Sequence, residues 1–204
     1  MGKQQPNDNS ILFLYEGETE GEFYKKVFDL YVPTREIKRN YGNLRGIYSL
    51  TEKVRGKIES YLQNDSSATL TKIHVFVAYD REGPRTKEGT LDLKSLRKEF
   101  LHNGSRIATI NEILATQDLE SWFFHDLEGI YKYLRTPSSQ RNMKAYPNVD
   151  ATNNRVLSHL FHRFDKHYQK GTRVKGFIDQ LDIEKIVKSV QELDEVLEII
   201  KKLY

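Results

Sequence analysis

Two strongly apolar runs stand out along the chain, and an acidic residue follows each of them. The first run, Ile11–Tyr15 (ILFLY), precedes Glu16, and the second, Lys72–Tyr79 (KIHVFVAY), precedes Asp80. Runs of this length and continuity are typical of strands that are buried on both faces of a parallel sheet. In such a sheet both acids would lie at the carboxyl ends of the strands, where ligands bind.

Helical patterns separate the predicted strands. After Glu16, Gly17 allows a turn, Thr19 and Glu22 have the spacing of a capping box, and apolar residues recur at helical spacing as far as Tyr31. The same spacing predicts helices over 50–62, 91–100, 118–134 and 156–168, two short helices or one long one over 183–200, and further strands within 35–41 and 107–114. Strands that alternate with helices predict a doubly wound, parallel α/β sheet of about four strands.

The composition indicates the size of the domain and the compartment in which the protein is expected. The 204 residues, of which 38% are hydrophobic, suffice for one domain with an accessory part. No run approaches the roughly 18 apolar residues of a membrane helix, and the N-terminal residues lack the apolar core of a signal peptide. The absence of cysteine excludes disulfides and thiolate chemistry. We therefore expect a cytoplasmic protein that does not enter a membrane.

Positive charge is concentrated in two segments, although the net charge is only +3. Residues 35–57 carry 7 Lys and Arg against 2 Asp and Glu, and residues 135–175 carry 9 against 2. Such segments favour binding to a phosphate backbone, and a solvated charged surface explains them equally well. The candidate nucleic-acid contacts are Arg35, Lys38, Arg39, Arg45, Arg141, Lys144, Arg173 and Lys175.

The acids predict a metal site if the two strands are neighbours. Glu82 lies two residues after Asp80, and Glu20 lies in the first turn of the first predicted helix. Carboxylates about 4 Å apart repel by about 4 kcal/mol per pair at an effective dielectric constant of 20, so such a cluster needs protons, basic partners or a cation. Oxygen ligands suit Mg²⁺ or Mn²⁺. The competing interpretations are a surface acid, a helix-dipole partner and, for Glu82, an ion pair with a nearby arginine.

The order ILFLYEG followed by VFVAYDRE resembles the TOPRIM fold of topoisomerases, primases and OLD-type nucleases. The sequences EGETE, DLESWFFHDL and HYQKG are similar to those of small OLD-like and RloB-like TOPRIM proteins, which are commonly encoded beside an ATPase in anti-phage defence. The resemblance implies a Rossmann-like TOPRIM catalytic core over residues 10–134 and a helical C-terminal extension over 135–204.

The resemblance also implies roles for single residues. Glu16, Glu20, Asp80 and Glu120 would bind one or two metal ions, and Glu16 and Asp80 would be catalytic. Glu82 stands where the family has a second aspartate, and its longer side chain changes the geometry of that ligand. Lys170, in preference to Lys166, matches the lysine after the late tyrosine and would stabilise charge that develops on the phosphate.

The resulting hypothesis is a Mg²⁺- or Mn²⁺-dependent nuclease that cleaves DNA in preference to RNA. It would act as the effector subunit of an ABC- or SMC-type ATPase system, and the C-terminal helices would allow a homodimer. The alternative is a non-catalytic nucleic-acid-binding or adaptor subunit of the same complex. Primase-like synthesis on the same fold is a third interpretation, which the lack of a zinc or helicase module disfavours.

Overall fold

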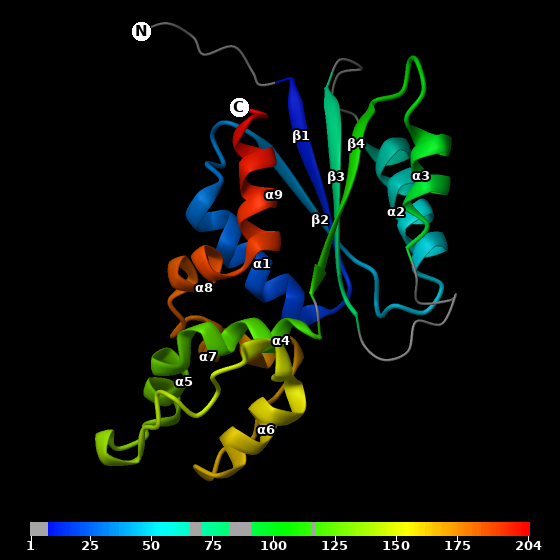
Figure 1. Ribbon diagram of the computed structural model, residues 1–204. Helices are drawn as coiled ribbons and strands as arrows, with labels where there is room; N and C mark the ends of the chain where they lie inside the picture. The colour runs from blue at the N-terminus through cyan, green and yellow to red at the C-terminus, as the bar shows by residue number, and fades with distance from the viewer. Residues whose placement is uncertain (1–7, 66–70, 82–90, 116) are drawn as a thin grey trace, which may run out of the picture.

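A four-stranded parallel sheet forms the centre of the computed structural model, which describes residues 8–65, 71–81, 91–115 and 117–204 (Figure 1). Its strands are β1 (Asn9–Tyr15), β2 (Lys38–Asn43), β3 (Lys72–Asp80) and β4 (Ile107–Ala115), in the order β2-β1-β3-β4. All three neighbouring pairs are parallel. The predicted α/β sheet is confirmed, and all four strands end at one side of it, which we call the carboxyl edge.

Helices cover both faces of the sheet, as the apolar strands predict. Leu14 of β1 packs on the face that carries α2 (Leu50–Asn64) and α3 (Leu93–Phe100). Its neighbour Phe13 packs on the opposite face against α1 (Glu18–Tyr31). Figure 1 shows α2 and α3 on one side of the strands and α1, α8 and α9 on the other. Alternate residues of β1 therefore enter two different hydrophobic clusters.

The chain after β4 is helical and packs on the α1 face. It contains α4 (Leu119–Phe123), α5 (Leu127–Leu134), α6 (Asn154–His162), α7 (Lys175–Ile178), α8 (Ile183–Ser189) and α9 (Gln191–Lys201). Ile130 and Leu193 share one hydrophobic cluster with Phe13, so the sheet and the C-terminal helices have a common core. The predicted boundary at residue 134 stays a prediction. Among the described residues, no helix combines the length and the apolar composition needed to cross a bilayer.

The single helix predicted over 118–134 is wrong, because a 3-10 turn at Phe124–Asp126 separates α4 from α5. Asp126 is only 4% exposed. Its Oδ2 accepts a hydrogen bond from the backbone N–H of Asp182 at 2.8 Å, and its Oδ1 lies 3.4 Å from Nζ of Lys185. We attribute the break to this buried carboxylate, which anchors the start of α8.

Two other element bounds differ from the prediction. β2 begins at Lys38 and not at residue 35, because Glu36 and Ile37 donate backbone hydrogen bonds to the carbonyl of Pro33 in a turn. α6 ends at His162 and not at residue 168. The chain turns away there, since the φ of Asp165 is 53°. This turn brings the following segment back toward the carboxyl edge.

Candidate active site

Glu16 and Asp80 meet at the carboxyl edge of the two central strands. Glu16 directly follows β1, and Asp80 is the last residue of β3. Oε2 of Glu16 accepts a hydrogen bond from the backbone N–H of Asp80 at 3.2 Å. Oδ1 of Asp80 accepts one from the backbone N–H of Leu119 at 3.0 Å, which ties β3 to α4. The predicted proximity of the two acids is confirmed, and their catalytic roles stay predictions.

Glu20 adds a third carboxyl group from the first turn of α1. Its side chain is buried and lies over Gly17, where an added Cβ atom would be 2.8 Å from Oε2 of Glu20. The φ of −139° at Gly17 is open to any residue, so a larger residue there would act only by displacing the Glu20 carboxyl group. Burial raises the pKa of the Glu20 carboxyl group, and the charge of Glu16 raises it further, while Lys170 opposes both.

Glu120 supplies the fourth carboxyl group, from α4, and its side chain is fully buried. Its Oε1 accepts a hydrogen bond from the hydroxyl group of Tyr168 at 2.9 Å and lies 3.3 Å from Nζ of Lys170. Its Oε2 is buried and makes no hydrogen bond. Burial raises the pKa of Glu120 to about 7, although the charge of Lys170 acts in the opposite direction.

The other three carboxyl groups all act on Asp80. Burial, followed by the charges of Glu20, Glu16 and Glu120, raises the pKa of Asp80 to about 9. Each ionised carboxylate disfavours the ionisation of the carboxyl groups around it. At neutral pH the site therefore holds protons on some of these groups, or it holds positive charge from elsewhere.

The segment that ends at Gly171 packs against the start of α1. The backbone N–H of Gly171 donates a hydrogen bond to Oγ1 of Thr19 at 2.9 Å across 152 positions of sequence. Gly171 has a φ of 83°, which favours glycine, and a Cβ there would lie 2.8 Å from Oε2 of Glu18. The predicted Thr19 capping box is wrong: the N-cap of α1 is Gly17, without a side-chain cap, and the Thr19 hydroxyl serves Gly171 instead.

The two late lysines have different environments. Lys170 forms the ion pair with Glu120, and its side chain is 44% exposed. Lys166 instead donates a hydrogen bond to the carbonyl oxygen of Tyr133 and lies over the Tyr133 ring, 4.4 Å from its centroid. Of the two lysines that the sequence offers, Lys170 is thus the one in contact with an acid of the site.

The donor set fits a hard divalent cation by its chemistry. All candidate ligands are carboxylate oxygens, and Oε2 of Glu120 is a buried acceptor that a cation would satisfy. Within the part of the chain that the structure describes, no group of three Asp, Glu or His side chains converges closely enough to hold an ion. Glu82, the remaining predicted ligand, lies outside the described residues. The described acids are electrostatically coupled without meeting at one point.

Part of the predicted nucleic-acid-binding set lies far from the acids. Lys38 and Arg39 begin β2, at the opposite end of the strand from the carboxyl edge, and Arg35 precedes them. Lys38 pairs with Asp65 at 3.1 Å, and Arg39 pairs with Asp29 at 2.9 Å. These three cationic residues therefore do not share a ligand-binding edge with Glu16, and their contact with nucleic acid stays a prediction.

Two of the predicted cationic residues lie close to the acidic segments. Arg45 follows the carboxyl end of β2, and the next residue, Gly46, donates a backbone hydrogen bond to the carbonyl of Glu16 at 2.9 Å. Arg173 belongs to the 3-10 helix Gly171–Val174, which packs against α1. Both arginines are exposed. They are the predicted contacts best placed to bind a phosphate beside the site.

Two of the remaining predicted nucleic-acid contacts interact with residues that are close to them in the sequence. Nζ of Lys175 lies 2.7 Å from Oδ2 of Asp179. Arg141 donates a hydrogen bond from Nε to the carbonyl of Thr136 at 3.0 Å, and Lys144 is exposed in the same loop between α5 and α6. Their role in nucleic-acid binding is a prediction that this geometry leaves untested.

Sequence reasoning missed two residues that shape the site. Asp118 caps α4 by accepting a hydrogen bond from the backbone N–H of Ser121, and it also accepts one from the backbone N–H of Asn154 at 2.7 Å. The Asp-x-x-Ser pattern before an apolar stripe is a helix-start signal that could have identified it. Tyr168 stands within the HYQKG sequence, but its contact with Glu120 depends on the turn after α6.

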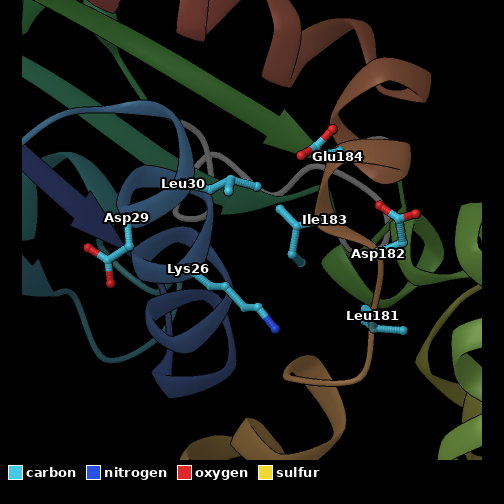
Figure 2. A pocket seen from close by; sticks show the side chains of 7 residues that line it. All are labelled: Lys26, Asp29, Leu30, Leu181, Asp182, Ile183 and Glu184. Carbon is cyan, nitrogen blue, oxygen red and sulfur yellow. The ribbon is translucent and has the colours of Figure 1, made fainter.

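A separate pocket of about 430 Å³ lies between α1 and the start of α8 (Figure 2). Leu30, Leu181 and Ile183 line it together with charged side chains. Leu30 follows Glu20 by ten residues on α1, which corresponds to about 15 Å along the helix at 1.5 Å per residue. This pocket is therefore not part of the acidic site.

Comparison with known proteins agrees with this architecture. Residues 15–201 match the family described as "Domain of unknown function (DUF4276)". Among solved structures, the C-terminal region of the Burkholderia pseudomallei OLD protein is similar, with a TM-score of 0.50 and 16% sequence identity over 95% of this chain and 96% of that chain. No curated protein matches the chain. At 16% identity the similarity shows the fold alone. The chain thus belongs to the DUF4276 family and has an OLD-like fold.

Proposed function

We propose that this protein is a Mg²⁺- or Mn²⁺-dependent nuclease that cleaves nucleic acid, with DNA as the preferred substrate. One observation carries the proposal. Four carboxyl groups from three separate parts of the chain are coupled at the carboxyl edge, where they disfavour one another's ionisation. A fold that holds several carboxyl groups this close together is suited to binding cations, because buried charges are paired or coordinate metals.

Glu16, Glu20, Asp80 and Glu120 are the described residues that would hold one or two ions, with Glu82 as a further ligand. A divalent cation bound there would supply positive charge that polarises a phosphodiester and offsets the charge that develops on its leaving oxygen. The chain itself would contribute Lys170, whose 44% exposed side chain reaches from Glu120 toward solvent. Lys170 would neutralise negative charge on a phosphate placed against the site.

The phosphate backbone would approach along the carboxyl edge. Of the cationic residues predicted to contact nucleic acid, Arg45 and Arg173 are the exposed ones that adjoin the acidic segments. Phosphate contacts position a nucleic acid without reading its sequence. We therefore propose cleavage without strong base specificity, and an affinity that falls with increasing salt.

We further propose a separate ATPase partner and a role in defence against phage. The support is the OLD-like fold: this chain covers 96% of a structure that is itself the C-terminal region of a longer protein. The OLD-like and RloB-like proteins that the sequence resembles are commonly encoded beside an ATPase. Co-purification of the natively expressed chain with an ATPase is the test, and isolation without any partner protein would contradict this part of the proposal.

The nuclease proposal is tested by incubating supercoiled plasmid with the purified protein and Mn²⁺ or Mg²⁺. Parent protein should nick or linearise the plasmid, whereas Glu16→Gln and Asp80→Asn should each lose at least about 100-fold of the rate, in the range found for groups that act on developing charge. Both variants retain an oxygen that can accept the observed backbone hydrogen bonds. Glu128→Gln, at an exposed acid on α5, is the matched control and should cleave normally. Equal cleavage by all four proteins would reject the site.

A non-catalytic nucleic-acid-binding or adaptor subunit is the second candidate function. It is favoured by the finding that no three of the described Asp, Glu and His side chains converge to hold an ion. Calorimetric titration with Mn²⁺ separates the two functions. Saturable binding that is lost in Asp80→Asn supports the nuclease, and nucleic-acid binding without any metal binding supports the adaptor.

A further inference from the structure

The two oxygens of Glu120 have different environments. Oε1 is contacted twice, by the Tyr168 hydroxyl group at 2.9 Å and by Nζ of Lys170 at 3.3 Å. Oε2 is buried and has no hydrogen-bond partner, in a side chain that is 0% exposed. A buried carboxylate oxygen without a donor is costly. The contacts to Oε1 therefore leave Oε2 as the oxygen that is available to a ligand.

Tyr168 is held firmly by its surroundings. Its ring makes edge-on contacts with Phe161 at 5.3 Å and with Phe177 at 6.1 Å between centroids. Three residues later, the hydrogen bond from Gly171 to Thr19 fastens the segment to α1. The Tyr168 ring is thus held by two aromatic rings, and the segment that follows it is held by the start of α1.

The Tyr168 hydroxyl group is the closer of the two contacts to Oε1. It donates a hydrogen bond to this oxygen at 2.9 Å. Lys170, by contrast, contacts Oε1 at the longer distance of 3.3 Å and has a 44% exposed side chain. A protonated phenol can donate one hydrogen bond in a fixed direction, which makes Tyr168 the more permanent of the two contacts.

We propose that Tyr168 is a positioning residue that holds Oε1 of Glu120, so that Oε2 is presented to a divalent cation in the acidic site. The proposal rests on the metal-dependent function proposed above and assigns a part of that site to the C-terminal extension. Residues that hydrogen bond to a metal-binding carboxylate commonly contribute about 10- to 100-fold to metal affinity.

The test compares Mn²⁺ affinity in Tyr168→Phe and the parent by calorimetric titration of the whole chain. Phe keeps the ring and its contacts with Phe161 and Phe177, so the variant should fold. We expect its Kd for Mn²⁺ to rise at least about 10-fold. Tyr133→Phe is the matched control, because it removes a hydroxyl from a ring that packs on the same Phe161 and Phe177, and its Kd should equal that of the parent.

A second comparison separates positioning from a merely structural role. Glu120→Gln should weaken Mn²⁺ binding to a Kd that is still measurable, and adding Tyr168→Phe to it should raise this Kd no further, because both changes act through the same oxygen pair. A Kd in Tyr168→Phe that matches the parent, while Glu120→Gln binds weakly, would overturn the positioning role and leave the nuclease proposal intact. A parent protein that binds no Mn²⁺ would overturn both.

Discussion

Oε2 of Glu16 lies 3.2 Å from the backbone nitrogen of Asp80, a residue 64 positions later. This hydrogen bond links the ends of two neighbouring parallel strands, in which Tyr15 pairs with Ala78. It brings two acids together through a side chain and a backbone amide, not through opposite charges. The paired strands therefore hold the two carboxylates close together despite their mutual repulsion. A bound cation would relieve that repulsion.

Asp80→Asn should remove a pH-dependent loss of stability from the metal-free protein. The pKa of Asp80 is about 9 in the folded protein against an ordinary value of 3.8. Because folding raises this pKa, the contribution of Asp80 is fully present below about pH 4 and is lost as the pH rises to about 9. We expect Asn to stabilise the protein by at least about 1.4 kcal/mol at pH 9, the equivalent of one pKa unit.

Thermal denaturation in EDTA between pH 5 and pH 9 measures this effect. The Tm of the parent should fall more steeply with pH than the Tm of Asp80→Asn. Glu128→Gln is the control, since Glu128 is an exposed acid paired with Lys132, and its pH profile should follow that of the parent. Parallel profiles for the parent and Asp80→Asn would show that Asp80 ionises normally.

Gly17→Ala should disturb the acidic site without unfolding the protein. The added Cβ would lie 2.8 Å from Oε2 of Glu20, so the Glu20 carboxyl group must move. The φ of −139° suits alanine, and we expect a stability loss of no more than about 1 kcal/mol, as for replacement of a glycine N-cap. Under the proposed function, Mn²⁺ affinity should fall about 10-fold or more.

Gly56→Ala is the matched glycine control. Gly56 lies on the exposed side of α2, and an added Cβ would meet no atom within 4 Å. Alanine there should stabilise the helix by about 0.5–1 kcal/mol and leave Mn²⁺ affinity unchanged. Chemical denaturation and calorimetry measure the two quantities, and an equal loss of Mn²⁺ affinity in both variants would disprove the special role of Gly17.

Asp126→Ala should destabilise the fold by about 3 kcal/mol. It would break the partly buried hydrogen bond from the backbone N–H of Asp182 and leave Lys185 without its partner. Asp179→Ala is the control, because the Asp179–Lys175 pair is exposed and should contribute less than about 1 kcal/mol. Urea denaturation compares the two, and similar losses would show that Asp126 does not anchor α8.

Arg45→Ala should weaken DNA binding more than Arg35→Ala, although both arginines belong to the basic segment 35–57. Arg45 adjoins the carboxyl edge beside Glu16, whereas Arg35 lies before the opposite end of β2. Losing one phosphate contact should reduce the slope of log K against log salt by about 0.9. Fluorescence anisotropy with a duplex in the Glu16→Gln background measures this slope, and identical slopes for both variants would place DNA elsewhere.

Much of the architecture can be predicted from the sequence, because its signals are local. The runs before Glu16 and Asp80 are apolar enough to require burial on both faces, and parallel strands so buried must end at one edge. The proximity of Glu16 and Asp80 follows from that geometry, and it is observed. The helix bounds were less predictable, since the break at Asp126 depends on Asp182, which lies 56 residues away.

Tertiary structure alone decided how the site is completed. Thr19 accepts a hydrogen bond from Gly171, and Glu120 accepts one from Tyr168, across 152 and 48 positions of sequence. Tertiary structure also places the two parts of the basic segment 35–57 at opposite ends of β2, with Arg45 at the end near the acids. The physical reason is common to these features: hydrophobic periodicity specifies which face of an element is buried, but only packing specifies which distant side chain meets it.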